Sequence, residues 1–339
     1  MLHRSSIPAT TPVGVRDLPP ELAQTFYQLQ AELLNTFKQA NYQRVLTPTF
    51  ELADVFEQGL GDTAAAQVMR FVDPQNGEVL ALRTDITPQI ARLMAGAMAD
   101  TPLPARVSYF GRVYRLRHEQ TFHRREVAQA GVELIGPADV AADVELIALC
   151  DQALSRTGIE GHTLSIGHAG SIGAILNTLS LESSSAETLR WLIGRKDTDG
   201  IETLAREEGL ATDTIAALIQ LTGLYGRPDA VLKGAETLRG QWPELDEACD
   251  RLRAVIDALE TQSLHCNLVV DLGEVQGFGY YTGVIFHAYV PGLGAAVASG
   301  GRYDNLLGRY GKSRAAAGFA IDEEGLTEIR MRENACQQP

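Results

Sequence analysis

Hydrophobic positions follow two different spacings along the chain, and each spacing predicts a different kind of element. After the proline pair at 19–20, apolar residues recur every three or four positions, which predicts an amphipathic helix that ends near Asn41. The apolar residues of this predicted helix are Leu22, Phe26, Leu29, Leu33 and Phe37. The next segment, 42–52, is rich in β-prone residues but contains Pro48, so it fits a strand end or an edge strand.

Two β-prone runs flank a basic loop between Arg106 and Gly136, and together they predict a hairpin. The basic residues in and around the loop are Arg112, Arg115, Arg117, His118, His123, Arg124 and Arg125. Guanidinium groups gathered in this way suit a phosphate or carboxylate ligand, because each can form two parallel hydrogen bonds. From spacing alone, a solvated hairpin whose charges only maintain solubility is an equally good interpretation.

The rest of the chain alternates between predicted strands and helices. Strands are predicted over 79–83, 164–166, 267–272, 280–290, 295–299 and 315–321. Helices are predicted over 89–98, 138–158 and 323–331, and throughout 183–262 with breaks at Gly200, Gly209, Gly226 and Pro243. This order predicts the α+β class, with a mostly antiparallel sheet flanked by helices.

The charge balance narrows the range of partners. The 339 residues carry a formal net charge of −14, which argues against a broad nucleic-acid surface and therefore against tRNA as a partner. Four cysteines, Cys150, Cys249, Cys266 and Cys336, include no C-x-x-C pair, so no metal site is expected. Neither a signal peptide nor a membrane span is expected from the apolar pattern, and we expect a cytoplasmic protein without a membrane partner.

Four sequence blocks resemble the class II aminoacyl-tRNA synthetases, and most closely the histidyl-tRNA synthetase type. The basic hairpin resembles motif 2, and LRTDITPQ (82–89) resembles the arginine-containing segment of the histidine site. GFGYYTGVIF (277–286) resembles the histidine-binding block, and SGGRYDNLLGRYG (299–311) resembles the approach to motif 3. The similarity extends over nearly the whole chain, from about residue 13 to about residue 329.

The resemblance implies a domain organisation. The expected synthetase-like core comprises residues 1–182 and 263–339, and residues 183–262 form a helical insertion. No C-terminal anticodon-binding domain is expected after the motif 3 region. The helix near the amino end and the strand with Pro48 resemble motif 1, which forms the dimer interface in that family, so a homodimer is expected.

The resemblance also implies a pocket for histidine. Asp85 and Gln129 would hold the α-amino group, while Glu133 and Tyr281 would contact the imidazole. The full set of expected ligand-binding residues is Asp85, Thr87, Arg115, Gln129, Glu133, Tyr280, Tyr281 and Tyr303. Two simpler interpretations stay open: Thr84 and Asp85 could merely cap the following helix, and each tyrosine could be an ordinary core residue.

Several positions depart from the pattern of an active synthetase. Gln276 and Gly325 stand where the family has arginines, and Asp322, Glu323 and Glu324 surround the second of these positions. Arg117 replaces a glutamate of the motif 2 loop, and Gly279 replaces an aspartate. Loss of one preorganised donor typically lowers a rate by about 10²–10³-fold, so we expect no catalytic residue and no nucleotide cofactor.

A synthetase core without this chemistry resembles the regulatory subunits of ATP phosphoribosyltransferase. That family works with a short-form catalytic subunit in the first step of histidine biosynthesis. The resemblance implies the short-form catalytic subunit as partner, L-histidine as effector, and a homodimer within a hetero-oligomer. Histidine could bind either the remnant pocket or a subunit interface.

Three other functions are possible. They are an active histidyl-tRNA synthetase, another ATP-dependent amino-acid ligase, and a scaffold without ligand. The first two need the missing arginines.

Overall fold

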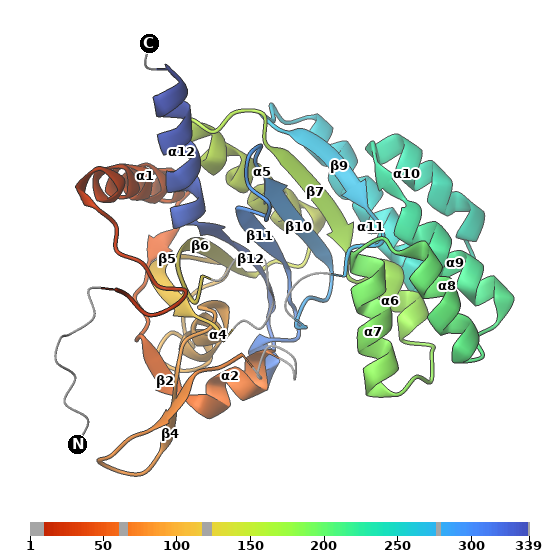
Figure 1. The fold of residues 1–339 in the computed structure, drawn as a ribbon, viewed down its shortest axis with the longest axis horizontal. Coiled ribbons are helices and arrows are strands. Elements are labelled where there is room, and N and C mark those ends of the chain that lie inside the picture. The colour runs from red at the N-terminus through yellow and green to blue at the C-terminus, as the bar shows by residue number, and fades with distance from the viewer. Residues whose placement is uncertain (1–9, 61–66, 117–123, 276–278, 338–339) are drawn as a thin grey trace.

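The computed structural model describes residues 10–60, 67–116, 124–275 and 279–337 (Figure 1). Within these residues, nine strands form one sheet in the order β1-β5-β6-β12-β11-β10-β7-β9-β8. Only two neighbouring pairs, β1–β5 and β7–β9, are parallel, so the predicted α+β class with a mostly antiparallel sheet is confirmed. The strands are β1 (Gln43–Arg44), β5 (Ala105–Tyr114), β6 (Glu126–Gly136), β7 (Thr163–His168), β8 (Tyr225–Gly226), β9 (Asn267–Asp271), β10 (Val284–Tyr289), β11 (Ala298–Arg302) and β12 (Ala315–Asp322).

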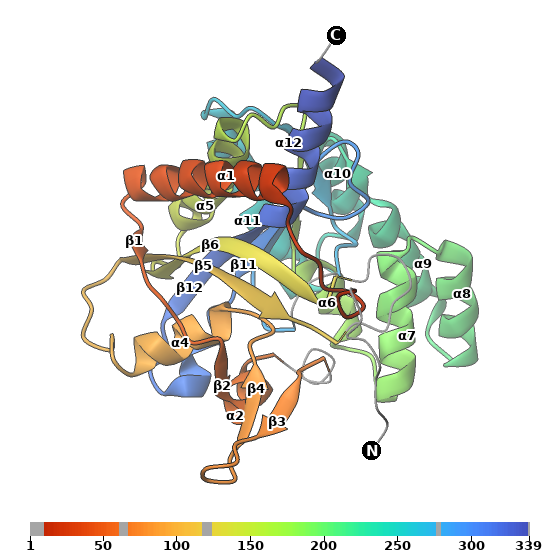
Figure 2. The same ribbon diagram turned by 60° about the vertical axis from the view of Figure 1, so that its left-hand side comes forward.

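Three helices cover one face of this sheet. Helix α1 (Pro20–Gln39) lies beside α12 (Glu323–Gln337), and α5 (Val140–Arg156) packs next to α1 and against β12 (Figures 1 and 2). The predicted apolar stripe of α1 is confirmed at Leu29, Leu33 and Phe37, which are fully buried in the main core. Packing on this face therefore sets the position of the start of α12, where Gly325 and the acidic residues beside it lie.

A second, smaller sheet lies on the opposite side and helps to enclose the site. Its order is β2-β4-β3, with β2 (Phe50–Leu52), β4 (Val79–Leu82) and β3 (Arg70–Val72). Helices α2 (Ala53–Leu60) and α4 (Thr87–Ala95) and the short helix η2 (Leu307–Tyr310) pack nearby. Helix α2 and strand β3 were not predicted, because both are short and the three residues of β3 are exposed.

The region 170–262 is mostly helical, as predicted from 183 onwards. Its helices are α6 (Gly170–Leu176), α7 (Ser183–Gly194), α8 (Thr198–Glu207), α9 (Thr212–Gly223), α10 (Pro228–Ala235), η1 (Glu236–Leu238) and α11 (Pro243–Glu260). The predicted break at Gly200 is wrong: this residue lies inside α8, where its N–H donates to the Asp197 cap. The break occurs at 195–197, where Lys196 has a positive φ of 58°.

This helical region joins the sheet rather than standing apart from it. The two-residue strand β8 lies at the break predicted at Gly226 and pairs with β9, although no strand was predicted there. The apolar core that contains Ile166 of β7 also contains Leu189 of α7 and Leu218 of α9. The division into a synthetase-like core and an insertion stays a prediction. Among the described helices, none has the length and apolar character that crossing a membrane requires.

Two predicted strand boundaries near the site are wrong. Strand β10 begins at Val284 instead of residue 280, and β11 occupies Ala298–Arg302 instead of 295–299. Tyr280 and Tyr281 therefore lie before β10, with Tyr280 in a turn. Tyr280 is buried against Tyr303, a contact between residues far apart in the chain that periodicity does not show.

Candidate functional site

A cavity of about 340 Å³ opens at the centre of the molecule and collects most of the predicted site residues. The walls include seven of the eight: Asp85, Thr87, Arg115, Gln129, Tyr280, Tyr281 and Tyr303. Leu293, Phe319 and the backbone of 294–298 add an apolar wall. A volume of this size lies at the lower end of the range for small-molecule sites, which suits an amino acid.

The side chains that line the cavity come from different elements of the fold. Asp85 follows β4, Thr87 begins α4, and Gln129 lies on β6. Because residues four apart on a strand point to the same face, Gln129 and Glu133 were predicted to lie together, and both face this side of the sheet. Gly318 of β12 pairs with Glu133 of β6. A Cβ on Gly318 would overlap the Glu133 carboxyl, so only glycine leaves room.

Glu133 lies one layer behind the cavity wall. The Thr87 hydroxyl donates to its Oε1 at 2.6 Å, and the Tyr303 hydroxyl donates to Oε2. Glu133 is 1% exposed, and burial raises the pKa of its carboxyl to about 8. It reaches the cavity only through these two hydroxyls, and its predicted contact with an imidazole stays a prediction.

Asp85 serves two purposes at once. Its Oδ1 accepts from the backbone N–H of Ile86, the next residue, at 2.9 Å, and its Oδ2 accepts from the Tyr280 hydroxyl at 2.7 Å. Burial raises the pKa of this carboxyl, and the nearby Arg115 guanidinium opposes that rise. The N-cap residue of α4 is Ile86, whose side chain forms no cap bond, and the Thr84 hydroxyl has no partner among the described residues, so the interpretation of Thr84 and Asp85 as mere helix caps is wrong.

The remaining polar groups complete one half of the cavity. Tyr280 packs edge-on against Tyr281 and Tyr303, with ring centroids 5.0 and 5.6 Å apart. Arg115 Nε donates to the carbonyl of Thr84 at 2.9 Å, which fixes its guanidinium at the rim. The buried Oε1 of Gln129 has no hydrogen-bond partner among the described residues, so it can accept a bond from a ligand.

The other end of the cavity combines residues noted in the sequence, Arg124 and Asp322, with two that were not, Arg16 and Glu328. Arg16, Arg124, Asp322 and Glu328 line this end. No periodicity or motif pointed to Arg16 or Glu328. Gly325 lies in the first turn of α12, as its alignment with motif 3 predicts, whereas Gln276, Arg117, His118 and His123 lie outside the described residues.

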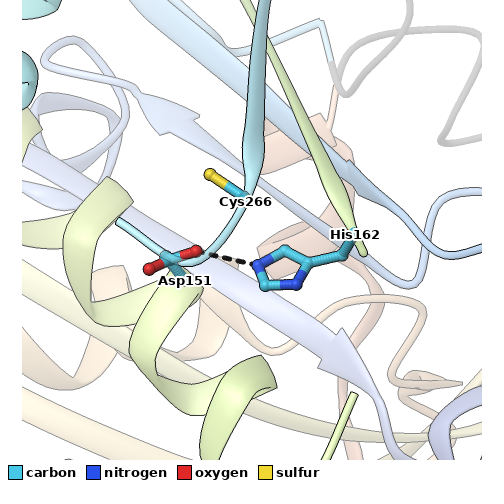
Figure 3. A group of neighbouring side chains, drawn as sticks. All are labelled: Asp151, His162 and Cys266. Carbon is cyan, nitrogen blue, oxygen red and sulfur yellow. Dashed lines mark hydrogen bonds and ion pairs between the residues drawn. The ribbon is translucent and has the colours of Figure 1, made fainter. Parts of the chain in front are cut away.

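A separate group of polar side chains lies on the other side of the sheet (Figure 3). Asp151 Oδ1 bonds His162 Nε2 at 2.8 Å, and Asp151 Oδ2 accepts from the backbone N–H of His265 at 2.9 Å. The Cys266 thiol lies near the same carboxylate, and its pKa is raised to about 12 by burial.

Carboxylate, imidazole and thiol would suit Zn²⁺ as donors. The carboxylate, however, stands at the centre of this group and already accepts bonds from two elements. The thiol also has no bond to the imidazole that would activate it as a nucleophile. We interpret Asp151, His162 and Cys266 as a hydrogen-bonded tie between α5 and the starts of β7 and β9.

Comparison with known proteins agrees with the fold. The model of the histidyl-tRNA synthetase family matches residues 14–326. An ATP phosphoribosyltransferase regulatory subunit from Anaeromyxobacter sp. (strain Fw109-5) is 41% identical over 323 residues, which cover 95% of this chain and 93% of the relative. A regulatory subunit from Moorella thermoacetica is 39% identical over 326 residues, covering 96% and 83%.

Solved structures show the same architecture. An ATP phosphoribosyltransferase regulatory subunit/histidyl-tRNA synthetase from Bacillus halodurans superposes with a TM-score of 0.84 at 31% identity, covering 95% of this chain and 84% of that one. A histidine–tRNA ligase subunit from Alicyclobacillus acidocaldarius superposes with a TM-score of 0.82 at 26% identity, covering 97% and 99%. The chain therefore belongs to the histidyl-tRNA synthetase-like family of ATP phosphoribosyltransferase regulatory subunits.

Proposed function

We propose that this chain binds the short-form catalytic subunit of ATP phosphoribosyltransferase in the cytoplasm and makes its activity depend on L-histidine. The observation that carries this proposal is the cavity itself. Its amino-acid end keeps a complete set of polar groups, while the arginines at its other end are already paired with carboxylates of the same chain. A site of this kind suits recognition of an amino acid without its activation.

The polar half of the cavity matches a zwitterion with an imidazole. The Asp85 carboxylate and the Gln129 Oε1 are acceptors for an ammonium group, and the Arg115 guanidinium faces the same space. The hydroxyls of Tyr281 and Tyr303 can bond a ring nitrogen, and the Glu133 carboxyl orients Tyr303. A site with these buried polar groups rejects an amino acid that leaves them unpaired.

Regulation follows from coupling between this cavity and a surface for the catalytic subunit. If histidine changes the affinity or activity of the complex, the catalytic subunit changes the affinity for histidine by the same factor, because binding free energies are reciprocal. We infer that synthetase activity is lost, and that the chain has no tRNA partner. The charge of −14 and the paired arginines at the cavity end support both inferences.

A homodimer within the complex is part of this proposal. The three-stranded sheet exposes a group of large apolar residues that a second copy would cover: Phe50, Leu52, Phe71, Val72 and Val79. The rings of Phe50 and Phe71 contact each other with centroids 6.1 Å apart, so the patch is continuous across β2 and β3. Exposed apolar surface of this kind is typical of protein interfaces.

The deciding experiment mixes the purified chain with the short catalytic subunit from the same organism. We expect formation of phosphoribosyl-ATP to increase strongly and histidine to reverse this increase. Gln129→Leu removes the unpaired acceptor and should weaken the response to histidine by about tenfold or more, since unpaired ligand groups cost about 1–3 kcal/mol. Glu202→Gln on the exposed face of α8 is the matched control.

Each outcome addresses a different part of the proposal. Absence of a complex and of activation would refute the role as a regulatory subunit. Activation with unchanged histidine inhibition in Gln129→Leu would place the effector site elsewhere. ATP–pyrophosphate exchange in the presence of histidine would support the synthetase alternative instead.

A further inference from the structure

Carboxylates from the start of α12 lie at the end of the cavity where basic side chains converge. Asp322 and Glu328 line the cavity, and Glu324 lines a smaller pocket that shares Arg16 and Arg124 with it. Asp322, the last residue of β12, turns back so that its Oδ1 accepts the backbone N–H groups of Glu324 and Gly325 at 3.1 and 3.0 Å. Glu324 lies two residues further along the chain and is 2% exposed. Glu328 lies one turn further along α12 and lines the cavity. Three acidic side chains thus point towards a region that the hairpin surrounds with arginines.

Each of three arginines in this region has an acidic partner. The Arg124 fork meets the Asp322 carboxylate with both terminal nitrogens, one of them at 3.2 Å. Arg112 Nη1 lies 3.1 Å from Glu324 Oε1. A fork-to-carboxylate pair uses the same geometry as a fork-to-phosphate pair, so a carboxylate in this position competes directly with phosphate.

Arg16 closes the group from the amino-terminal segment. Its Nε donates to Glu324 Oε2 at 3.1 Å, and its Nη1 lies 2.7 Å from Glu328 Oε1. The same segment is held on the hairpin by the backbone N–H of Arg125, which donates to the carbonyl of Gly14 at 2.7 Å. Glu324 is therefore shared by all three arginines, at 3.1 Å from Arg16 and Arg112 and 3.8 Å from Arg124, and it is the most buried of the three carboxylates.

The space at position 325 supports the same interpretation. A Cβ placed on Gly325 would lie 3.0 Å from Asp322 Oδ2, closer than nearly all real contacts. The Asp322 carboxylate thus occupies the volume that a side chain at 325 would need. Position 325 therefore lacks the arginine of the family, and the Asp322 carboxylate lies next to the place where its side chain would begin.

We propose that Asp322, Glu324 and Glu328 act as a built-in anion that occupies Arg16, Arg112 and Arg124, so that the cavity excludes phosphorylated ligands and admits an amino acid alone. We call these six residues the carboxylate lock. With three carboxylates against three guanidinium groups, a polyphosphate would meet no net positive charge and would be repelled unless it displaced the acids. The cavity then responds to the amino acid independently of the concentration of ATP.

This inference deepens the proposed function, and it rests on that function for the identity of the amino acid. The test, however, needs neither histidine nor the catalytic subunit. Titration calorimetry with inorganic pyrophosphate and with Mg²⁺–ATP measures anion binding to the full chain directly. We expect the unaltered chain to bind both anions weakly or not at all.

Removal of a lock carboxylate should create an anion site. Glu324→Gln removes the carboxylate that all three arginines share, while Arg112 keeps Glu126 at 3.5 Å, and we expect binding of pyrophosphate to become about tenfold tighter or more. Glu328→Gln releases only one contact of Arg16 and should give a smaller gain in the same direction. Raising the salt concentration should reduce both gains, because the new contacts are ionic.

A matched control distinguishes the lock from a general change in charge. Glu236→Gln removes a carboxylate that also holds two arginines, Arg239 and Arg253, but on the exposed surface of the helical region. It should leave anion binding unchanged.

Two results would overturn the inference. One is tight anion binding by the unaltered chain. The other is the absence of a gain in both Glu324→Gln and Glu328→Gln, with circular dichroism showing that at least the half-exposed Glu328 variant is folded. Neither result would affect the test of histidine regulation.

Discussion

The hydroxyl of Tyr303 donates a hydrogen bond to the carboxyl of Glu133, although Tyr303 faces the cavity and Glu133 lies behind it. Thr87 bonds the other oxygen of the same carboxyl at 2.6 Å. One buried acid thus sets the direction of two hydroxyls that meet the ligand. Its influence on binding is indirect, and it should show in stability as well as in affinity.

Replacement of Glu133 by glutamine tests this arrangement. The amide keeps the shape but can accept from only one of the two hydroxyls at its oxygen, so the other loses its acceptor. We expect the free energy of unfolding to fall by about 1–3 kcal/mol and histidine binding to weaken by about tenfold. Urea denaturation and calorimetry measure the two effects. Equal stability together with equal affinity would show that the carboxyl does not orient Tyr303.

Glu133 also predicts a pH dependence of stability. Its carboxyl has a pKa near 4.5 in the unfolded chain, and burial raises this pKa to about 8 in the folded protein. The folded state therefore keeps a proton that the unfolded state loses. The stability from this group is fully present below pH 4.5 and is lost as the pH rises to about 8, by about 1.4 kcal/mol per pH unit.

Urea denaturation between pH 5 and pH 9 checks this prediction. The slope of stability against pH reports how many more protons the folded state binds than the unfolded state, and Glu133→Gln should lower this number by about one. The buried Glu323, whose pKa is raised to about 7 by burial, contributes in the same direction, so Glu323→Gln serves as the reference for a slope from another site. An unchanged slope in Glu133→Gln would mean that its carboxyl titrates normally.

Gly318 predicts a large effect from a single methyl group. A Cβ at this position would overlap the Glu133 carboxyl and the carbonyl of Val132. We expect Gly318→Ala to destabilise the protein by about 1–3 kcal/mol and to weaken ligand binding, since the clash displaces the acid behind the site. Thermal denaturation and histidine titration report the two changes.

The control for this variant is Gly173→Ala. Gly173 lies inside α6, and an added Cβ would meet no atom within 4 Å. Alanine favours helix over glycine by about 1 kcal/mol, so stability should rise slightly or stay the same. A similar loss of stability in both variants would show that the loss in Gly318→Ala does not come from the clash with Glu133.

The long elements were predictable from the sequence because their periodicity is strong and their apolar face is buried. Helix α1 and the hairpin of β5 and β6 belong to this class, and the even spacing of Gln129 and Glu133 placed both on one face. The short, exposed strand β3 carried no such signal. The start of β10 was also missed, because the packing of Tyr280 against Tyr303 comes from residues far apart in the chain.

The candidate site divides in the same way. The residues of the amino-acid end were named from motifs, whereas the pairing of Arg16 with Glu324 and Glu328 was not predicted. These residues lie more than 300 positions apart, and no local pattern records an ion pair between them. The sequence showed that a cation was missing at Gly325. Only the fold shows that the Asp322 carboxylate lies 3.0 Å from where a Cβ at this position would be.

The exposed apolar residues of the small sheet lead to the final prediction. Phe71 is 41% exposed on β3, and its ring contacts Phe50 on β2. If a second copy covers this patch, Phe71→Glu would bury a charge in the interface, and we expect the dimer to weaken by about thirtyfold or more. Light scattering over a concentration series would then show a monomer. Tyr225→Glu, at an exposed aromatic residue on β8, should leave the dimer intact. A Phe71→Glu protein that remains dimeric would place the interface elsewhere.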